Sequence, residues 1–484
     1  MRGRIEPPES LNEDQRLAFD TAVNGRRSSF ITGDAGTGKS HLLNEIVEAF
    51  TKASRRTIVV APTGIAALNV GGVTVHRWAG ITFDENVETS VDKIRRFKKT
   101  SAWTAVDTLV IDEISMLSGR ILTLIDSIFR KLRKNYEAVP FGGVQIIAFG
   151  DFLQLQPVEK GVTNPKLCFE SDAWNGVEKT CYLSTPVRQN DADFIRCLRE
   201  IRMGYLSEEC EKMLRCRLVA SIDLVPSVST ILYSRVDQVE RENTRRLALL
   251  PGEAFVYKGV LQSDGSAYGQ RAVKALAASS KSPEILTLKM DAQIMVTANI
   301  SLDDGLVNGA RGVVTYLDES CVIIALDSNP RKHITLAPKK IERRDGLDRV
   351  PVTYTQYPLM LAYAITIHKA QGLTMTNFAV DMRSVFEAGQ VYVAISRARR
   401  FEDFVIVGEL AKDKIFASLK AKNYYLKLLS DGNCPNKTSH SECVGCNQEF
   451  CVTCSVPMDD FMKSVGVCRG CMEGDAPSKK SRLD

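Results

Sequence analysis

The chain has 484 residues, of which 44% are hydrophobic and 25% are charged. These values are typical of globular proteins, so they exclude wholesale disorder and fibrous repeats, and the length predicts roughly three domains. The longest nearly apolar run, Leu359 to Ile367, is about half as long as a membrane-spanning helix. The N-terminal segment contains prolines and acids where a signal peptide would be apolar. We therefore expect an intracellular protein without a membrane partner.

The net charge is +5, and it is unevenly distributed along the chain. Residues 431 to 484 hold six Lys or Arg against eight Asp or Glu, so this end carries −2 and residues 1 to 430 carry +7. A mild basic excess is compatible with a nucleic-acid partner, but it is too small to establish one.

Short apolar segments recur in the first part of the chain. They are rich in β-branched residues and show no polar alternation, which is typical of strands buried on both faces of a parallel sheet. Helix-like stretches at Ser40 to Ser54 and Ile121 to Lys134 lie between them, so the pattern predicts an α/β domain. The predicted strands are Ser29 to Thr32, Thr57 to Val60, Thr108 to Ile111, Val144 to Phe149 and Cys181 to Leu183.

A second strand series follows and predicts a second α/β domain. Its members are Thr230 to Tyr233, Gln293 to Thr297, Phe378 to Val380 and Phe404 to Val407. Between Asn299 and Tyr357 the sequence pattern changes to short strand-like segments separated by Gly, Asp and Pro. This pattern predicts a small all-β insertion. The small and polar residues from Ser263 to Lys281 predict a flexible loop.

These segments predict a domain organisation. The expected units are a first α/β domain at 1–185 with a small insertion at about 68–90, a second α/β domain at 186–298 and 356–430, a β insertion at 299–355, a cysteine-rich module at 431–472 and a disordered tail at 473–484.

A complete phosphate-binding loop lies between the first predicted strand and the first predicted helix. Its glycines let backbone N–H groups turn toward phosphate oxygens, and the helix N-terminus adds partial positive charge. Lys39 is expected to reach the terminal phosphates and Ser40 to ligate Mg²⁺. The alternative is a glycine-rich turn that binds no nucleotide. The loop consists of Gly33, Asp34, Ala35, Gly36, Thr37, Gly38, Lys39 and Ser40.

Two adjacent acids follow the predicted strand Thr108 to Ile111. Carboxyl ends of parallel strands meet at one edge of a sheet, so Asp112 and Glu113 are expected beside the phosphate loop. Asp112 can then hold hydrated Mg²⁺, and Glu113 can act as the base that polarises the attacking water. Without the phosphate loop, solvated acids at a strand end would explain the pair equally well.

Two arginines can supply positive charge from outside the first domain. Arg188 lies near the junction of the two α/β halves, and Arg397 lies in the second half. A guanidinium that meets the γ-phosphate only when two domains close couples hydrolysis to motion. The alternative for each is an ordinary surface arginine.

Taken together, these motifs resemble those of the PIF-type (petite integration frequency) DNA helicases of superfamily one. The resemblance runs in order from about residue 11 to 410. Gln156 departs from the family, which usually has Pro there, whereas the coupling residue Gln154 is present. The matching segments are Leu11 to Gln15, Ala61 to Ala67, Thr74 to His76, Phe141 to Gln145, Gly150 to Leu155, Gly305 to Gly309, Tyr363 to Thr374 and Arg397 with its neighbours.

The resemblance implies two RecA-like parallel-sheet domains, an SH3-like β insertion in the second, and an ATP- and Mg²⁺-dependent 5′-to-3′ helicase that acts on single-stranded and forked DNA in replication, repair or recombination. It implies that Gln15 reads adenine and that Gln371 and Gly372 contact the nucleotide. The residues that it implies along the DNA strand are Thr63, Gly64, His76, His368 and Thr374. For the two histidines, a satisfied core position is the alternative. Trp78 and Phe83 lie where the family has a duplex-splitting wedge, and core packing explains them equally well.

Seven of the 13 cysteines cluster near the C-terminal end, where the resemblance does not extend. Pairs with C-x-x-C spacing place two thiolates within reach of one tetrahedral ion, so eight ligands predict two structural Zn²⁺ sites. The local charge of −2 favours a protein partner for this module, with nucleic-acid binding or a structural cap as alternatives. The predicted ligands are Cys434, His440, Cys443, Cys446, Cys451, Cys454, Cys468 and Cys471.

The function predicted from the sequence is therefore an ATP-dependent DNA helicase with an appended zinc module. The alternative is a nucleotide-switch ATPase, or a zinc-module adaptor, that binds DNA or protein without processive unwinding. We expect a monomer when free, at a nuclear or viral replication site. A mitochondrial location is disfavoured because the N-terminal segment is not an arginine-rich amphipathic transit peptide. The physiological DNA substrate and the pairing of the zinc ligands stay open.

Overall fold

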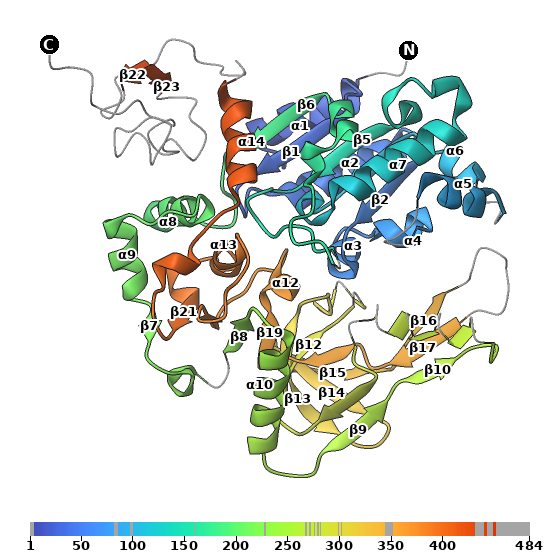
Figure 1. The fold of residues 1–484 in the computed structure, drawn as a ribbon. Helices are drawn as coiled ribbons and strands as arrows, with labels where there is room; N and C mark the ends of the chain where they lie inside the picture. Colours follow the sequence, from blue (N-terminus) through green and yellow to red (C-terminus); the bar gives the residue numbers. More distant parts are fainter. Residues whose placement is uncertain are drawn as a thin grey trace, which may run out of the picture.

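The computed structural model describes residues 4–430 except 82–85, 97–99, 160, 227–228, 267–268, 271–272, 275, 278–279, 281, 299, 302 and 344–351, and it also describes 440–442 and 449–451. Two parallel sheets with their helices lie next to one another, and antiparallel sheets extend from the second (Figure 1). The predicted α/β class with parallel sheets is confirmed. No helix of the described residues is both long enough and apolar enough to span a bilayer.

The first parallel sheet has the strand order β3-β2-β4-β5-β1-β6. Its central strands β1, β4 and β5 are buried along their whole length, which explains their continuous apolar sequences. The predicted strands of this domain agree with the structure to within two residues at each end. Their bounds are β1 Ser29–Gly33, β2 Thr57–Ala61, β3 Val73–Thr74, β4 Thr108–Ile111, β5 Gln145–Phe149 and β6 Lys179–Leu183.

Helices cover both faces of this sheet (Figure 1). Helix α7 buries Leu122, Ile125 and Phe129 at helical spacing, as predicted. Trp78 packs with its ring centroid 4.6 Å from that of Trp103 and 5.9 Å from that of Phe129, so it belongs to the core. Phe83 lies outside the described residues. The helices are α1 Glu13–Phe19, α2 Lys39–Lys52, α3 Gly64–Asn69, α4 Val75–Ala79, α5 Val87–Arg96, α6 Thr100–Thr104 and α7 Gly119–Leu132.

The second parallel sheet has the order β19-β8-β20-β21-β7. Its strands are β7 Leu218–Val219, β8 Thr230–Tyr233, β19 Ala364–Thr366, β20 Phe378–Asp381 and β21 Phe404–Val407. Its helices are α8 Ala192–Arg202, α9 Glu208–Arg215, α10 Val236–Leu249, α12 Ile367–Ala370 and α13 Gln390–Ile395.

The last helix of the core, α14 (Leu419–Ser430), does not pack where the predicted boundaries assigned it. Ala421 and Tyr425 are buried in the hydrophobic core of the first domain, although 356–430 was predicted to belong to the second. The chain therefore returns to the first parallel sheet before residue 430. Sequence pattern cannot reveal this because an apolar helix face does not specify which core receives it.

The antiparallel region is larger than the predicted insertion at 299–355. It forms sheets of order β15-β14-β13-β12-β18, β10-β17-β16 and β11-β9. The strands are β9 Phe255–Lys258, β10 Val260–Gln262, β11 Ile285–Leu288, β12 Gln293–Val296, β13 Arg311–Leu317, β14 Val322–Leu326, β15 Asn329–Leu336, β16 Lys339–Arg343, β17 Val352–Gln356 and β18 Leu359–Leu361. That these sheets form an SH3-like fold stays a prediction.

The assignment of Gln293 to Thr297 to the second parallel sheet is wrong. This segment is β12, which pairs antiparallel with β13 and with β18. Ile294 and Val296 enter the core of the antiparallel region, whereas Met295 enters the core of the second parallel domain. Because both faces are buried, the strand shows no polar alternation and has the pattern of a parallel strand.

The prediction of a flexible loop at Ser263 to Lys281 is wrong for the residues of this segment that lie in a hydrophobic core. Val273, Leu276 and Ala277 are buried against Val352 and Tyr354 of β17. Small side chains gave this segment the composition of a loop, but an apolar strip at helical spacing is enough to bury it.

Most of the predicted zinc ligands lie outside the described residues, as does the predicted tail at 473–484. Strand β22 (His440–Glu442) pairs antiparallel with β23 (Glu449–Cys451), and only the backbone of these two strands is described. The ligands outside the described residues are Cys434, Cys443, Cys446, Cys454, Cys468 and Cys471.

Candidate nucleotide site

The phosphate loop follows β1 and leads into α2. Gly36 and Gly38 adopt φ values of +85° and +80°, which L side chains rarely adopt. A Cβ at Gly36 would lie 2.7 Å from the Arg188 Cβ, and a Cβ at Gly38 would lie 2.5 Å from the Gln15 Nε2. Both glycines are therefore required by the turn and by the close approach of neighbouring side chains.

The Lys39 ammonium lies inside this loop. Its Nζ donates to the carbonyl oxygens of Gly33 at 2.7 Å and Asp34 at 2.8 Å. Burial lowers the pKa of Lys39, and the charges of Asp151 and Glu113 oppose that shift. The loop thus holds the Lys39 cation through its own carbonyl oxygens, at the position from which Lys39 is expected to reach phosphate oxygens.

Asp112 and Glu113 extend from the end of β4, as their position after the strand predicted. Burial raises the pKa of Asp112 to about 8, and the nearby Glu113 carboxylate adds to the shift. Glu113 has a φ of +48°, an uncommon value for a residue with a side chain. Its Oε2 accepts a hydrogen bond of 2.9 Å from Gln371 Nε2 of the second domain.

The residues around Asp112 fit a bound Mg²⁺. Ser40, Asp112 and Glu113 line one small cavity, and hydroxyl and carboxylate oxygens are the ligands that Mg²⁺ prefers. A bound cation would also stabilise the charged form of Asp112, which burial alone disfavours.

A cleft of about 450 Å³ opens between the two parallel domains. Residues predicted from distant motifs meet on its walls, with the phosphate loop and Glu113 on one side and Arg397 on the other. The backbone N–H of Arg188 donates to the Gly36 carbonyl at 3.0 Å, whereas its guanidinium reaches across to the side of Arg397. Its lining residues are Ala35, Gly36, Gly38, Lys39, Ser40, His41, Glu113, Gln154, Val187, Arg188, Gly372, Thr374, Arg397 and Arg399.

The arginines form a positively charged wall. Burial, together with the charge of the neighbouring Arg397, lowers the pKa of Arg188 to about 9. Arg188 Nη1 donates to the Ser396 carbonyl at 2.8 Å, and Arg397 Nε donates to the Val393 carbonyl at 2.7 Å. Guanidiniums held by carbonyl oxygens keep their positive charge, so this wall is suited to binding an anion.

Two ionisable lining residues were not predicted from the sequence. Arg399 lies two positions after Arg397, and His41 directly follows Ser40. Their proximity to predicted motif residues was the only available signal, because neither residue type is demanded by the motif itself.

Gln15 is hydrogen-bonded to the phosphate loop. Its Nε2 donates to the Thr37 carbonyl at 3.1 Å, and its Oε1 accepts from the backbone N–H of Asn12 at 3.1 Å. Both the nitrogen and the oxygen of the side-chain amide have hydrogen-bond partners within the protein, so Gln15 stabilises the phosphate loop. Reading of adenine by this residue stays a prediction.

The residues predicted to contact DNA do not all lie together. Thr63 and His368 line the small cavity that also contains Asp112, and Gly64 begins α3. His76 lies in α4, where burial lowers its pKa. Thr374 lines the nucleotide cleft. That these residues contact DNA stays a prediction.

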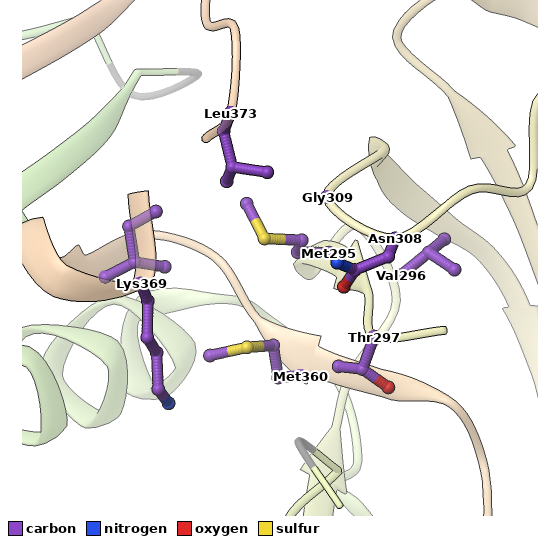
Figure 2. Close-up of a pocket in the computed structure, with 9 residues that line it drawn as sticks. Met295, Val296, Thr297, Asn308, Gly309, Met360, Lys369 and Leu373 are labelled. Atoms are coloured by element: carbon purple, nitrogen blue, oxygen red, sulfur yellow. The ribbon is translucent and has the colours of Figure 1, made fainter. Parts of the chain in front are cut away.

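Two further motifs meet at the junction of the second parallel domain and the antiparallel region. Figure 2 shows Asn308 and Gly309 from one segment near Leu373 from another. A Cβ at Gly309 would lie 2.6 Å from Leu373 Cδ2, so only glycine fits there. The cavity is about 10 Å³, too small for more than one water, so this region is a packing junction.

Among the residues that the structure describes, no group of three or more His, Cys, Asp or Glu side chains could hold a metal ion. The predicted zinc sites are thus neither supported nor tested by the described part of the chain, because most of their ligands fall outside it.

The chain matches two family models. Residues 10–212 match the PIF1-like helicase model, and residues 273–317 match the model of the 2B domain of DNA helicase Pif1. The second match starts before residue 299, in agreement with the larger antiparallel region.

Individual proteins are also similar to this chain. ATP-dependent DNA helicase PIF1 of Xenopus laevis is 36% identical over 399 residues, which cover 81% of this chain and 60% of that protein. The chain thus spans less than two thirds of that relative. A crystal structure of Pif1 helicase from Candida albicans is 32% identical with a TM-score of 0.75, covering 86% of this chain and 99% of that one.

A structure of Bacteroides Pif1 helicase in complex with ADP-AlF3 and ssDNA is 27% identical with a TM-score of 0.63, covering 88% of this chain and 99% of that one. The family match, the shared fold and the cleft built from the predicted motifs agree, and this chain belongs to the PIF1-like helicase family.

Proposed function

We propose that this protein is an ATP- and Mg²⁺-dependent DNA helicase that moves 5′ to 3′ on a single strand and unwinds duplex DNA. The observation that carries the proposal is the cleft between the two parallel domains, which has Lys39 and Glu113 on one wall and the guanidiniums of Arg188 and Arg397 on the other. Similarity to helicases solved with ADP-AlF3 and ssDNA supports the same assignment.

Each wall of the cleft has its own part in hydrolysis. Lys39 and the loop N–H groups bind the β- and γ-phosphates, and Ser40 and Asp112 would hold Mg²⁺. When bound, Mg²⁺ neutralises phosphate charge. Glu113, oriented by its hydrogen bond from Gln371, accepts a proton from the attacking water. Arg188 and Arg397 stabilise the charge that develops on the transferring phosphoryl group. Gln154 senses the γ-phosphate, and Gly372 lies against the nucleotide.

Closure of the cleft couples hydrolysis to movement along DNA. Opening one duplex step costs about 1.4 kcal/mol, and stacking a freed base on protein returns about 1 to 3 kcal/mol. A motor therefore only has to trap frayed bases and advance. Thr63, Gly64, His76, His368 and Thr374 are proposed to contact the strand, and Thr374 also lines the nucleotide cleft.

Single-stranded and forked DNA are the proposed partners, with roles in replication, repair or recombination. The alternative, a nucleotide switch that does not unwind, predicts ATP binding without strand displacement.

Unwinding of paired duplexes that differ only in tail polarity separates these two readings. We expect wild type to displace the strand with a 5′ tail but not the one with a 3′ tail, and Lys39→Ala to displace neither. Equal unwinding by wild type and Lys39→Ala would contradict the motor, because the variant lacks the cation that binds the terminal phosphates.

A second part of the proposal concerns the C-terminal cysteines. The three C-x-x-C pairs support a module that binds two Zn²⁺ ions and engages a protein partner. Metal analysis of the purified protein tests the zinc content, and absence of bound zinc would contradict it.

A further inference from the structure

A buried ion pair joins the two parallel domains behind the phosphate loop. Asp151 follows β5 of the first domain, and Arg202 ends α8 of the second. Arg202 Nε and Nη2 each lie 2.9 Å from a carboxylate oxygen of Asp151, and the two side chains are 3% and 0% exposed. Burial favours the neutral acid, but the charge and hydrogen bonds of Arg202 outweigh it and lower the pKa of Asp151.

The hydroxyl of Tyr425 from α14 completes this arrangement. It donates to Asp151 Oδ1 at 3.1 Å and accepts from the backbone N–H of Phe152 at 3.2 Å. It also lies 2.7 Å from the hydroxyl of Thr32. The Arg202 guanidinium lies 5.0 Å from the centroid of the Tyr425 ring. Burial raises the pKa of Tyr425 well above its ordinary value, so the hydroxyl keeps its proton and donates a hydrogen bond to the carboxylate.

Two residues bonded to the Tyr425 hydroxyl, Thr32 and Phe152, lie just before segments that line the nucleotide cleft. Thr32 directly precedes Gly33, which is the last residue of β1 and the first residue of the phosphate loop. Phe152 precedes Gln154, which lines the nucleotide cleft. The Tyr425 hydroxyl therefore ties the segment that carries Gln154 to the strand that carries the phosphate loop.

The neighbouring Tyr424 also packs α14 against the first domain. The Tyr424 ring stacks on Phe169 with a centroid distance of 4.3 Å and an interplanar angle of 16°. Its hydroxyl accepts a hydrogen bond of 3.2 Å from Trp174 Nε1, away from the phosphate loop. Both rings pack α14, but their hydroxyls have separate partners: that of Tyr424 contacts Trp174, and that of Tyr425 contacts charged and backbone groups.

We propose that Tyr425 is a positioning residue for ATP hydrolysis. It fixes the position of the segment that carries Gln154 relative to the phosphate loop. This inference rests on the proposed function. It makes α14, which lies beyond the motif residues, a part of the ATPase.

Tyr425→Phe tests the inference because it removes only the hydroxyl. We expect kcat of ssDNA-stimulated ATP hydrolysis to fall about tenfold, as loss of one hydrogen bond to a charged group implies, while KM for ATP changes less than about twofold. Tyr424→Phe is the matched control, and its kcat should stay near that of wild type. Thermal melting of both variants reports the folded fraction.

Thr32→Val removes the second hydroxyl of the same contact and serves if Tyr425→Phe does not fold. It should lower kcat with little change in KM, and the effects of the two substitutions should not add. Wild-type kinetics in Tyr425→Phe or in Thr32→Val would overturn the inference. So would equal kcat loss in Tyr424→Phe and Tyr425→Phe, because that result reports packing of α14. Lack of ssDNA-stimulated hydrolysis by wild type would instead overturn the proposed function.

Discussion

The two walls of the nucleotide cleft are built from different chemistry. On the first wall the Lys39 cation is held by carbonyl oxygens and faces the carboxylate of Glu113, so opposite charges balance. On the second wall Arg188, Arg397 and Arg399 gather, and burial together with the neighbouring arginine brings the pKa of Arg188 to about 9. The first wall is thus a ready cradle, whereas the second holds excess positive charge that an anion in the cleft would stabilise. Closure on ATP is expected to be favourable for this reason.

The largest expected effect is on the arginine wall. Arg397→Ala should lower kcat for ATP hydrolysis about 10³-fold, because a guanidinium that meets the transferring phosphoryl group contributes on this scale. Arg397→Lys keeps the charge but loses the planar donors, and should be nearly as slow. Steady-state hydrolysis with ssDNA measures both. If Arg397→Lys retains wild-type kcat, charge alone is sufficient and the geometric role is wrong.

The next effect is on the phosphate-loop wall. Glu113→Gln should lower kcat about 10²- to 10⁴-fold, since the amide cannot accept a proton from water. Equilibrium binding of a fluorescent ATP analogue should be retained, because Lys39 and the loop remain. Binding lost together with hydrolysis would show that Glu113 supports the cradle instead of acting as the base.

A smaller effect is expected at the exposed edge of the arginine wall. Arg399→Ala should raise KM for ATP about fivefold, with a dependence on salt typical of an exposed charge. Arg400→Ala is the matched control, because Arg400 pairs with Asp403 at 3.2 Å. Equal KM values for the two variants would remove Arg399 from the site.

The smallest expected effect is on stability. Because the pKa of Asp112 is raised to about 8 in the folded protein, the folded state binds more protons than the unfolded chain between about pH 4 and pH 8. Stability should therefore fall as pH rises through this window, and Asp112→Asn should flatten the dependence. Thermal melting without nucleotide or Mg²⁺ measures it. Parallel curves for wild type and Asp112→Asn would mean that Asp112 is ionised in the fold.

The cleft could be predicted because its residues belong to local motifs at the ends of parallel strands. Gly33 to Ser40 follow β1 and Asp112 follows β4, and the carboxyl ends of neighbouring parallel strands necessarily converge. Contacts such as the 2.7 Å hydrogen bond from the backbone N–H of Ala35 to the Tyr392 hydroxyl could not be predicted. They join elements hundreds of residues apart, and no spacing rule relates them.

The same distinction explains the errors in the fold. Gln293–Val296 is buried on both faces, so its sequence has the pattern of a parallel strand although its partners are antiparallel. Helix α14 has an apolar face that either parallel domain could receive. Burial is visible in the residues, but the identity of the covering element is not.

The sequence by itself determined the two parallel domains, the phosphate loop, the carboxylate pair and the family, because each rests on short-range pattern. Only the tertiary structure decided that Thr374 lies on the nucleotide cleft, that the antiparallel region begins well before residue 299, and that Tyr425 reaches the root of the phosphate loop. These facts depend on which surfaces pack together, and packing is settled by the combined shape and charge of segments that are distant in the chain.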